Sequence, residues 1–523
     1  MTRIRSAITD DNRRWWTLGA MCFALFMIML DNTVVNVALP SIQKDLHSSI
    51  SGLEWTVNAY TLSFAVLLVT GGRLGDIFGR RRMFLFGVAV FGLSSAFIGF
   101  SQTEAWLVTG RAIQGIGAAF MMPATLSIIT NAFPANERGK AIGTWAGVSA
   151  LALAIGPVVG GFLTENVSWQ SIFFLNVPVA ALAVFVTLAA TRESRDETST
   201  HHVDFFGVAT ISTGLGALVL ALVEGNSWGW GSPRILALFA VAAVALTAFV
   251  IAELRVDEPM VDFSFFRSKS FLGANIVAFI VSFAMLAMFF FLALYMQNIK
   301  GYSPLQAGVR FLPSTLLVAV AGPISGRLSD RIGPRPLMVA GLVMISGAMF
   351  WQGHLAVDTS YGFLVGAFML MGLGIGLVMS PMSTAAMNAV EPTKAGVASG
   401  ILSMWRMVGG TFGVAVMGAL ITGVGKSKLD DLLPAVPNGR RQDLAEGLGA
   451  GGAHVGGRIG DAVQQAFVYA LNDGLRIAAA VTLISAVVAW LLIGDRATAP
   501  SEAGAQGAGP GPAEAEPELV EAA

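Results

Sequence analysis

The sequence has few charged residues: Asp, Glu, Lys and Arg make up 12% of its 523 residues, against about 25% in an ordinary soluble domain. It has a single cysteine, Cys22, which excludes a disulfide within the chain and a cysteine metal cluster. The formal net charge is -1, so no excess of positive charge indicates a nucleic-acid partner. The His-Glu-x-x-His and Gly-x-Ser-x-Gly motifs of hydrolytic enzymes are also missing. We therefore expect a protein that is not an enzyme and has no cofactor or metal.

Apolar residues are abundant instead. Hydrophobic residues make up 54% of the chain, and the mean hydropathy is +0.68. Many apolar runs are about 20 residues long, which is enough to cross a bilayer as a helix. We predict an all-α membrane protein with fourteen spans, at roughly 16–39, 54–72, 83–101, 105–128, 140–163, 169–190, 206–223, 235–252, 271–296, 306–326, 337–354, 361–383, 396–422 and 468–493.

Lysine and arginine gather on one side of this predicted topology. If the N-terminus is cytoplasmic, the inside segments hold most of the basic residues, whereas the short outside loops hold only Lys44, Arg234 and Lys300. Basic loops stay on the cytoplasmic side of a membrane. Because an even number of spans returns the chain to its starting side, we expect both termini in the cytoplasm. The expected location is the inner (cytoplasmic) membrane of a cell.

One short motif occurs twice at matching places. Gly72 to Arg81 follow one long apolar segment, and Gly326 to Arg335 follow another, with Gly, Leu, Asp, Gly and Arg at the same spacing. A basic loop between two membrane helices, repeated in the second half, is typical of a transporter built from two repeats. Equivalent positions such as Asp76 and Asp330 are 254 residues apart. That distance is too long for six helices with short loops and fits eight.

This spacing predicts the domain organisation. Residues 1–195 should form a first six-helix bundle, 196–265 two inserted helices with their linkers, and 266–495 a second six-helix bundle. The second bundle should include a long extracellular loop at about 424–466, since the apolar pattern is interrupted there. Residues 496–523 contain mainly Ala, Gly, Pro and Glu, and we expect a disordered cytoplasmic tail.

Three further motifs lie inside predicted spans. Leu30 to Pro40 read LDNTVVNVALP in the first span, Leu107 to Ala118 contain Arg111 and Gln114 in the fourth, and a glycine-rich run starts at Gly147 in the fifth. With the duplicated loop, these motifs closely resemble those of the major facilitator superfamily, in particular its fourteen-helix drug:proton antiporters. The resemblance covers nearly the whole chain. It implies alternating access between two bundles, proton coupling at the fourth span, and an antiporter motif of Gly147, Gly156, Pro157, Gly160 and Gly161.

The resemblance also implies a conformational latch between the bundles at the cytoplasmic face, formed by Gly72, Asp76, Gly79, Arg80, Arg81 and Asp330. The residues themselves leave simpler roles open. A role as topology anchors alone would explain Arg80 and Arg81. Close helix packing alone would explain the glycines of the fifth span. Asp76 does not fit a topology anchor, because a carboxylate reduces the positive charge of the loop. A contact with a helix N-terminus or a neighbouring arginine explains it better.

Two opposite charges lie inside spans at similar depth. Counting about 1.5 Å per residue, Asp31 lies roughly 13 Å below the outer surface and Arg111 roughly 10 Å. A charge at the membrane centre costs on the order of 2.5–3.5 kcal/mol on insertion scales, so we expect the two to face the interior and to pair directly or through water. The pair can be a static bridge between helices. It can also couple to protons, since burial and a nearby arginine change a carboxylate's proton affinity in opposite directions.

Other side chains are candidates for the substrate cavity, and they are Asn32, Asn36, Trp55, Asn58, Tyr60, Gln114, Tyr295, Gln297 and Arg406. The run Gly425-Lys426-Ser427 ends like a phosphate-binding loop but lacks its first glycine, so ATP is not expected as the energy source. We expect a proton as the coupling ion, a small hydrophobic substrate, contact with membrane lipid, and function as a monomer.

The sequence therefore predicts a secondary active exporter of hydrophobic drugs or antibiotics in exchange for protons. Two alternatives remain open. A proton-coupled importer of a small nutrient would share the fold, and Thr191 to Arg195 faintly resemble the loop after the sixth helix of sugar porters. A non-transporting membrane sensor or lipid-handling scaffold belongs to a different class, and it would not need the paired charges.

Overall fold

The structure is a computed structural model that describes residues 9–48, 50–196, 204–256, 259–449 and 457–494. These residues form helices and connecting turns, with no β-strand among them. The first part of the chain contains α2 (Asp10–Leu46), α3 (Ile50–Phe78), α4 (Arg80–Gly99), α5 (Glu104–Ala132), α6 (Arg138–Asn166), α7 (Ser171–Phe174) and α8 (Asn176–Ala190). Then follow α9 (Phe205–Trp228), α10 (Pro233–Glu253), α11 (Lys269–Leu294), α12 (Pro304–Ile332), α13 (Pro334–Gln352), α14 (Tyr361–Asn388), α15 (Ala395–Leu432), α16 (Asn438–Gly449) and α17 (Gly457–Leu492).

The helices have the length and composition of a polytopic membrane protein. Thirteen helical segments in the described part of the chain are long and apolar enough to cross a membrane. They correspond to every predicted span except the one at about 140–163, which falls in α6. This helix has 29 residues, or roughly 43 Å at 1.5 Å per residue, and is long enough to cross as well. The fold is therefore an all-α membrane fold.

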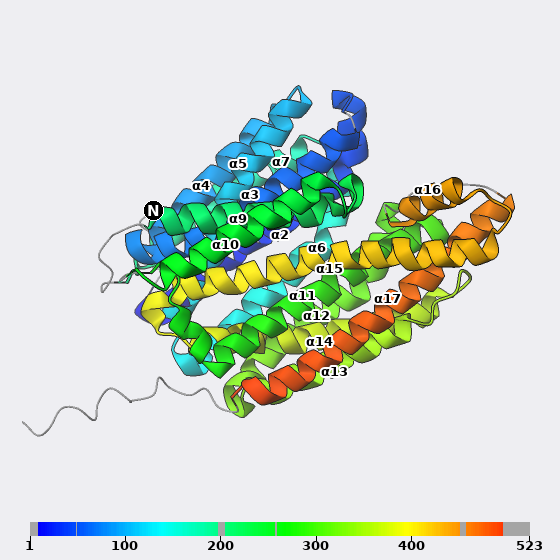
Figure 1. Cartoon of the computed structure of the whole chain (residues 1–523). Helices are drawn as coiled ribbons and strands as arrows, with labels where there is room; N and C mark the ends of the chain where they lie inside the picture. Colours follow the sequence, from blue (N-terminus) through cyan, green and yellow to red (C-terminus); the bar gives the residue numbers. More distant parts are fainter. Residues whose placement is uncertain (1–8, 49, 197–203, 257–258, 450–456, 495–523) are drawn as a thin grey trace, which may run out of the picture.

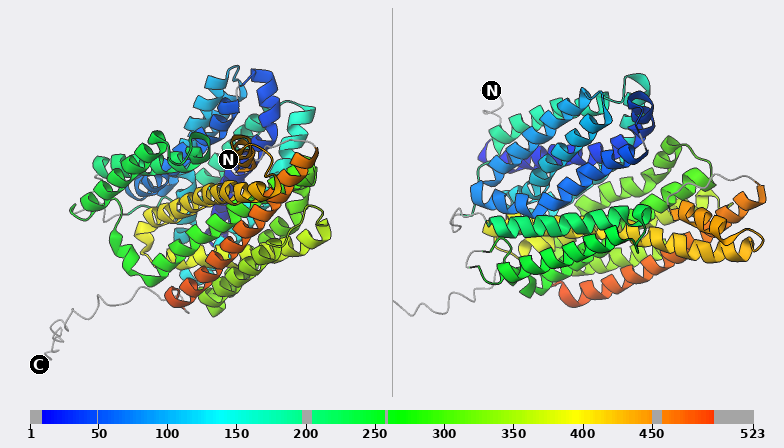
Figure 2. Two further views of the ribbon diagram at one scale, coloured as in Figure 1. Left: turned by 45° about the vertical axis from the view of Figure 1, so that its right-hand side comes forward. Right: turned by 45° about the horizontal axis from the view of Figure 1, so that its top comes forward.

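The helices form two groups with a pair between them. Helices α2 to α8 make one half and α11 to α17 the other, as the blue-to-cyan and green-to-red segments show (Figures 1 and 2). The inserted helices α9 and α10 pack against each other, and α9 also contacts α3 of the first half and α15 of the second. The predicted disordered tail, 496–523, lies outside the described residues.

Two glycines of the duplicated motif end helices at equivalent places. Gly79 separates α3 from α4 with φ +108°, and Gly333 separates α12 from α13 with φ +85°. Residues that carry a side chain rarely adopt a positive φ. Glycine therefore allows each sharp reversal between consecutive helices. We call this end of the molecule the basic end, because Arg80, Arg81 and Arg335 lie beside these turns.

The predicted long loop at 424–466 is wrong for most of its length. Helix α15 continues to Leu432, α16 covers Asn438–Gly449, and α17 begins at Gly457. Leu444 and Leu448 are buried, and Arg441 Nε lies 3.1 Å from Asp430 Oδ1. A few apolar side chains and an ion pair hold helix α16 against α15. A search for long apolar runs does not detect so short an apolar face.

Candidate functional site

A buried ion pair joins the first and fourth spans. Arg111 on α5 donates from Nη1 to Oδ2 of Asp31 on α2 at 2.5 Å, and each side chain is about 2% exposed. Two opposite charges at this depth would each be unfavourable alone, and the contact offsets part of that cost. The structure thus brings together the two residues whose depths match in the sequence.

Amide side chains occupy the other oxygen of the carboxylate. Gln114 on α5 and Asn176 at the start of α8 each donate from their side-chain nitrogens to Oδ1 of Asp31 at 2.9 Å. The same two amides donate to Oγ of Ser95 on α4, at 2.7 Å from Gln114 and 3.3 Å from Asn176. Asp31 is therefore held by one cation and two amides in a shared polar network.

The guanidinium of Arg111 has further partners. Its Nε donates to the carbonyl oxygen of Thr56 on α3 at 3.1 Å, and its Nη1 donates to Oε1 of Gln114 at 2.6 Å. The ring of Tyr60, which is 1% exposed, lies 4.3 Å from the guanidinium carbon. Five helices of the first half thus meet at one polar cluster, which we call the Asp31 network: Asp31, Thr56, Tyr60, Ser95, Arg111, Gln114 and Asn176.

Ser95 and Asn176 are members of this network that sequence reasoning missed. Asn176 lies within the apolar segment Ser171–Ala190 and is 2% exposed. A buried amide inside a span is a signal of its own, because it needs a hydrogen-bond partner there. Ser95 carries no comparable signal, since serine is common in packed membrane helices.

The remaining cavity candidates lie on several helices of both halves. Asn32 donates to the Ile28 carbonyl and Asn36 to the Asn32 carbonyl, both at 3.0 Å and both within α2. Tyr295 is buried and its hydroxyl donates to the Ala356 carbonyl at 2.6 Å, and its place in the cavity stays a prediction. Trp55, Asn58, Gln297 and Arg406 are half-buried.

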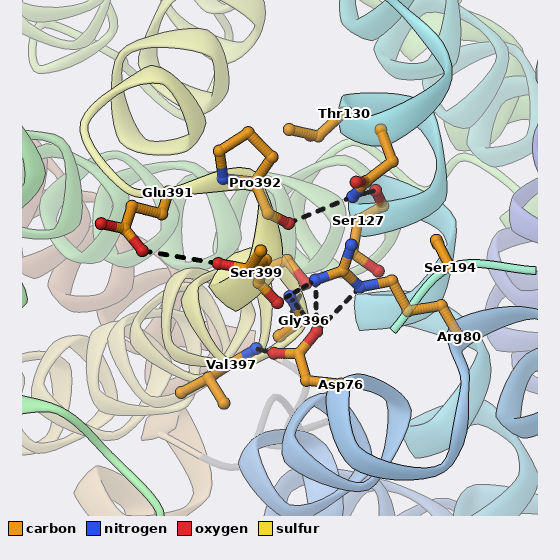
Figure 3. Close-up of polar contacts among 12 residues, drawn as sticks. Asp76, Arg80, Ser127, Thr130, Ser194, Glu391, Pro392, Gly396, Val397 and Ser399 are labelled. Atoms are coloured by element: carbon orange, nitrogen blue, oxygen red, sulfur yellow. Dashed lines mark hydrogen bonds and ion pairs between the residues drawn. The ribbon is translucent and has the colours of Figure 1, made fainter. Parts of the chain in front are cut away.

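The duplicated motif forms the first of two contacts between the halves. Asp76, at the end of α3, accepts from the backbone nitrogens of Gly396 at 2.9 Å and Val397 at 2.8 Å, in the first turn of α15 (Figure 3). Arg80 donates to Asp76 at 2.6 Å and to the Thr393 carbonyl at 2.5 Å. A carboxylate at a helix N-terminus satisfies free backbone donors and interacts well with the helix dipole. Asp76 is therefore a cap supplied by one half to a helix of the other.

The second copy makes the matching contact in the opposite direction. Asp330, near the end of α12, accepts from the backbone nitrogens of Gly139 at 3.0 Å and Lys140 at 3.1 Å. These residues lie in the first turn of α6. Each half thus caps a helix of the other with a carboxylate, and we call the two contacts the Asp76 latch and the Asp330 latch. Both lie at the basic end.

Glycines let the backbones meet beside each latch. A Cβ on Gly72 would collide with the carbonyl oxygen of Gly396, and one on Gly326 would collide with that of Gly139. Further along α6, a Cβ on Gly147 would lie 2.8 Å from the Ala319 carbonyl oxygen of α12. No side chain fits between these helices. The halves are therefore closely packed at the basic end.

The predicted latch residues make different contacts. Arg80 is 1% exposed and belongs to the Asp76 latch, so it is more than a topology anchor. Arg81 instead donates to the Leu188 carbonyl at 3.3 Å within the first half, and its role in the latch stays a prediction. Gly79 provides the turn, and a Cβ there would lie 2.7 Å from the carboxyl carbon of Glu193.

The glycines of the fifth span divide between two neighbours. Gly147 faces α12, whereas Cβ atoms on Gly156 and Gly160 would meet Thr33 and Val34 of α2. Gly161 has ordinary room, with its nearest contact at 3.9 Å. The side chain of Pro157 lies outside the described residues. Helix α6 thus packs on both halves, which is the geometry expected of packing glycines, and the antiporter role of the motif stays a prediction.

One ion pair outside the spans lies beside the Asp76 latch. Lys394 Nζ is 2.8 Å from Asp262 Oδ2. Burial raises the pKa of Asp262, but the hydrogen bonds from Lys394 and Ser264 outweigh burial and hold it below its usual value. The segment that follows the inserted helices is therefore tied to the turn before α15.

The chain is similar in sequence and in fold to known proteins. The family model of the Major Facilitator Superfamily matches residues 21–414. The tetracenomycin C resistance and export protein of Streptomyces glaucescens is 34% identical over 496 residues, covering 91% of each chain. The puromycin resistance protein pur8 of Streptomyces alboniger is 36% identical over 499 residues, covering 94% of each. The crystal structure of the human organic anion transporter MFSD10 (TETRAN) has a TM-score of 0.61 at 15% identity, over 91% of this chain and 99% of that one, and it supports the fold alone.

Proposed function

Because this chain belongs to the major facilitator superfamily, we propose that it exports hydrophobic drugs or antibiotics in exchange for protons. Relatives along nearly its whole length are named for resistance to tetracenomycin C and puromycin, and one also for export. The fold is that of a multi-pass membrane transporter. Counted with α6, the described residues contain fourteen helices long enough to cross a membrane, which supports a likeness to the fourteen-helix drug:proton antiporters that the motifs resemble.

The observation that carries proton coupling is the Asp31 network. Asp31 is a buried carboxylate whose partners come from α5 and α8. Those partners in turn contact Thr56 of α3 and Ser95 of α4, so that helix movement can change the surroundings of Asp31. Arg111, Gln114 and Asn176 all donate to this carboxylate. Asp31 can accept a proton once these donors withdraw, and releases it when they return. Drug binding that favours the arrangement in which these donors contact Asp31 expels the proton.

The two latches support alternating access. They hold the halves together at the basic end, and release of both contacts would let the halves separate there.

In this proposal the proton is the coupling ion, with no role for ATP. One proton crossing 100 mV supplies about 2.3 kcal/mol, which corresponds to roughly a 50-fold gradient of a neutral drug. That gradient is large enough for resistance.

We assign the basic end to the cytoplasm, on the positive-inside rule. With the buried Cys22 replaced, a cysteine at Ser264 should be protected from an impermeant thiol reagent in intact cells, because Ser264 is exposed in the short 3-10 helix before α11 at the basic end. A cysteine at Ser427, exposed on the opposite end of α15, should react. Permeabilised cells provide the control, since both positions should then be labelled. Labelling of the Ser264 variant in intact cells would reverse the assignment.

The function is tested by transport in proteoliposomes. Purified protein with an imposed pH gradient should move some members of a panel of hydrophobic antibiotics against their own gradient, in the direction opposite to the protons. A nutrient importer would move its substrate with the protons. A sensor or scaffold would move nothing under either gradient.

A further inference from the structure

Arg406 is a charged side chain in the middle of a span. It lies on α15, eleven residues after Ala395 where the helix begins, or roughly 16 Å along the helix. A bilayer's hydrocarbon core is about 30 Å thick, so this position is near its centre. Charges at that depth are unfavourable unless they are paired, and they mark binding sites or ion pathways by default.

The guanidinium has no carboxylate partner among the residues that the structure describes. Its Nη2 donates to the hydroxyl of Ser383 on α14 in a short hydrogen bond, and its Nε is buried without a partner. The neighbouring helices α11 and α14 contain no Asp or Glu at all, and the first carboxylate further along α15 is Asp430. Arg111 has the opposite situation, because Asp31 neutralises it.

Arg406 faces the other half of the protein. On the same face of α15, seven residues earlier, Ser399 donates to the Pro123 carbonyl of the first half at 2.7 Å. On α14, Ser380 lies three residues before Ser383 and donates to the Gly139 carbonyl at 3.2 Å. Residues three or seven apart share one face of a helix. Arg406 and Ser383 therefore lie on the surface between the halves, one to two turns beyond the contacts that close the basic end.

The turn of α15 that carries Arg406 and the part of α14 just before Ser383 are rich in apolar, adaptable side chains. Met404, Met407 and Met379 are part-buried, and the rings of Trp405 and Phe279 lie 6.1 Å apart in an edge-to-face arrangement. Flexible thioethers and aromatic rings repack around varied apolar shapes. These two helices thus combine one unneutralised cation with adaptable apolar side chains, between the two halves where a transporter of this type holds its substrate.

We propose that Arg406, assisted by Ser383, binds the anionic group of a hydrophobic organic anion, such as a carboxylate or an ionised phenol. The inference rests on the proposed export function and names the class of substrate. The planar guanidinium can give two parallel hydrogen bonds to such a group. Its free Nε and the Nη2 now bound to a serine hydroxyl are the donors for it. The apolar body of the substrate packs on the methionine and aromatic side chains.

Two fluorescent probes that differ chiefly in a sulfonate test the proposal. The anion 8-anilinonaphthalene-1-sulfonate and the neutral N-phenyl-1-naphthylamine are titrated against the purified full-length protein in nanodiscs, with protein-free nanodiscs as background. The wild type should bind the anion more tightly. Arg406→Gln should weaken anion binding about ten- to a hundredfold, the loss expected for hydrogen bonds to a charged group, and should change binding of the neutral probe less than about twofold. Arg406→Lys should lie between them.

Arg310→Gln is the matched control. Arg310 is another half-buried arginine within a span of the second half. It lies against the ring of Tyr302 at 3.7 Å, near the end of α12 that is remote from the basic end. This variant should leave both probes unaffected. Unchanged anion binding by Arg406→Gln, or an equal loss for both probes in Arg406→Gln and Arg406→Lys, overturns the proposal. The titration uses no proton gradient, so proton-driven export by the wild type can still succeed or fail separately.

Discussion

Replacing Asp31 by asparagine should abolish proton-driven drug export. The amide has nearly the shape of the carboxylate and can still bind Arg111 through its oxygen, but it cannot take up a proton. In proteoliposomes with a proton-motive force of about 100 mV, the drug gradient should fall from roughly 50-fold to none. Drug binding and exchange of labelled for unlabelled drug should persist, because neither process requires net proton transfer. Both are measured on the same preparation.

Ser95→Ala is the matched control for this variant. It removes a hydroxyl that Gln114 and Asn176 contact but leaves the titratable group, so uphill export should persist at a reduced rate. Retained uphill export by Asp31→Asn would contradict the coupling role. A static bridge predicts a different pattern, in which both single charge variants at Asp31 and Arg111 fail to fold and the charge swap restores folding.

Replacing Asp76 by asparagine should open the basic end. The variant loses a charge that accepts two backbone hydrogen bonds from α15 and pairs with Arg80. A hydrogen bond to a charged group contributes about 1.5–3 kcal/mol, so the closed state should lose about ten- to a hundredfold in population relative to the open one. In a background without Cys22, a cysteine at Ser399, which is buried, should react faster with a thiol reagent applied to the basic end.

Asp45→Asn provides the comparison for the latch. Asp45 is a carboxylate near the opposite end of α2, where it accepts from Nε1 of Trp169 at 2.8 Å. This change should not alter labelling at position 399. Normal transport and unchanged labelling in Asp76→Asn would show that the cap does not control the conformational equilibrium. The Asp330→Asn variant should behave like Asp76→Asn, because the second latch repeats the first.

The pairing of Asp31 with Arg111 was predictable because it needs only helix counting. Each residue is the charged member of an apolar span, and depth in the bilayer follows from about 1.5 Å per residue. The partners of Asp76 and Asp330 were not, since they are backbone nitrogens of Gly396, Val397, Gly139 and Lys140. Backbone donors have no sequence signature. The repeated motif identified the loops, but only the fold shows which helices they contact.

The prediction for the region after the thirteenth span was wrong for a related reason. Apolar run length identifies a helix in lipid, but α16 and the ends of α15 and α17 pack on each other outside any such run. Their helicity depends on tertiary contacts such as the burial of Leu448, which no local pattern specifies. The partner of Tyr295 was not predictable either, because its hydroxyl donates to the backbone carbonyl of Ala356.

The central claim is that drug and proton exclude each other at the Asp31 network, and proton release on drug binding tests it most directly. Purified wild-type protein in a weakly buffered solution with a pH indicator is mixed with a compound that the transport panel identifies as a substrate. The wild type should release protons, up to about one per drug bound, if the drug favours the ionised carboxylate. The Asp31→Asn variant should bind the same compound and release none. Equal release from both proteins, or binding to the wild type without release, would contradict the account.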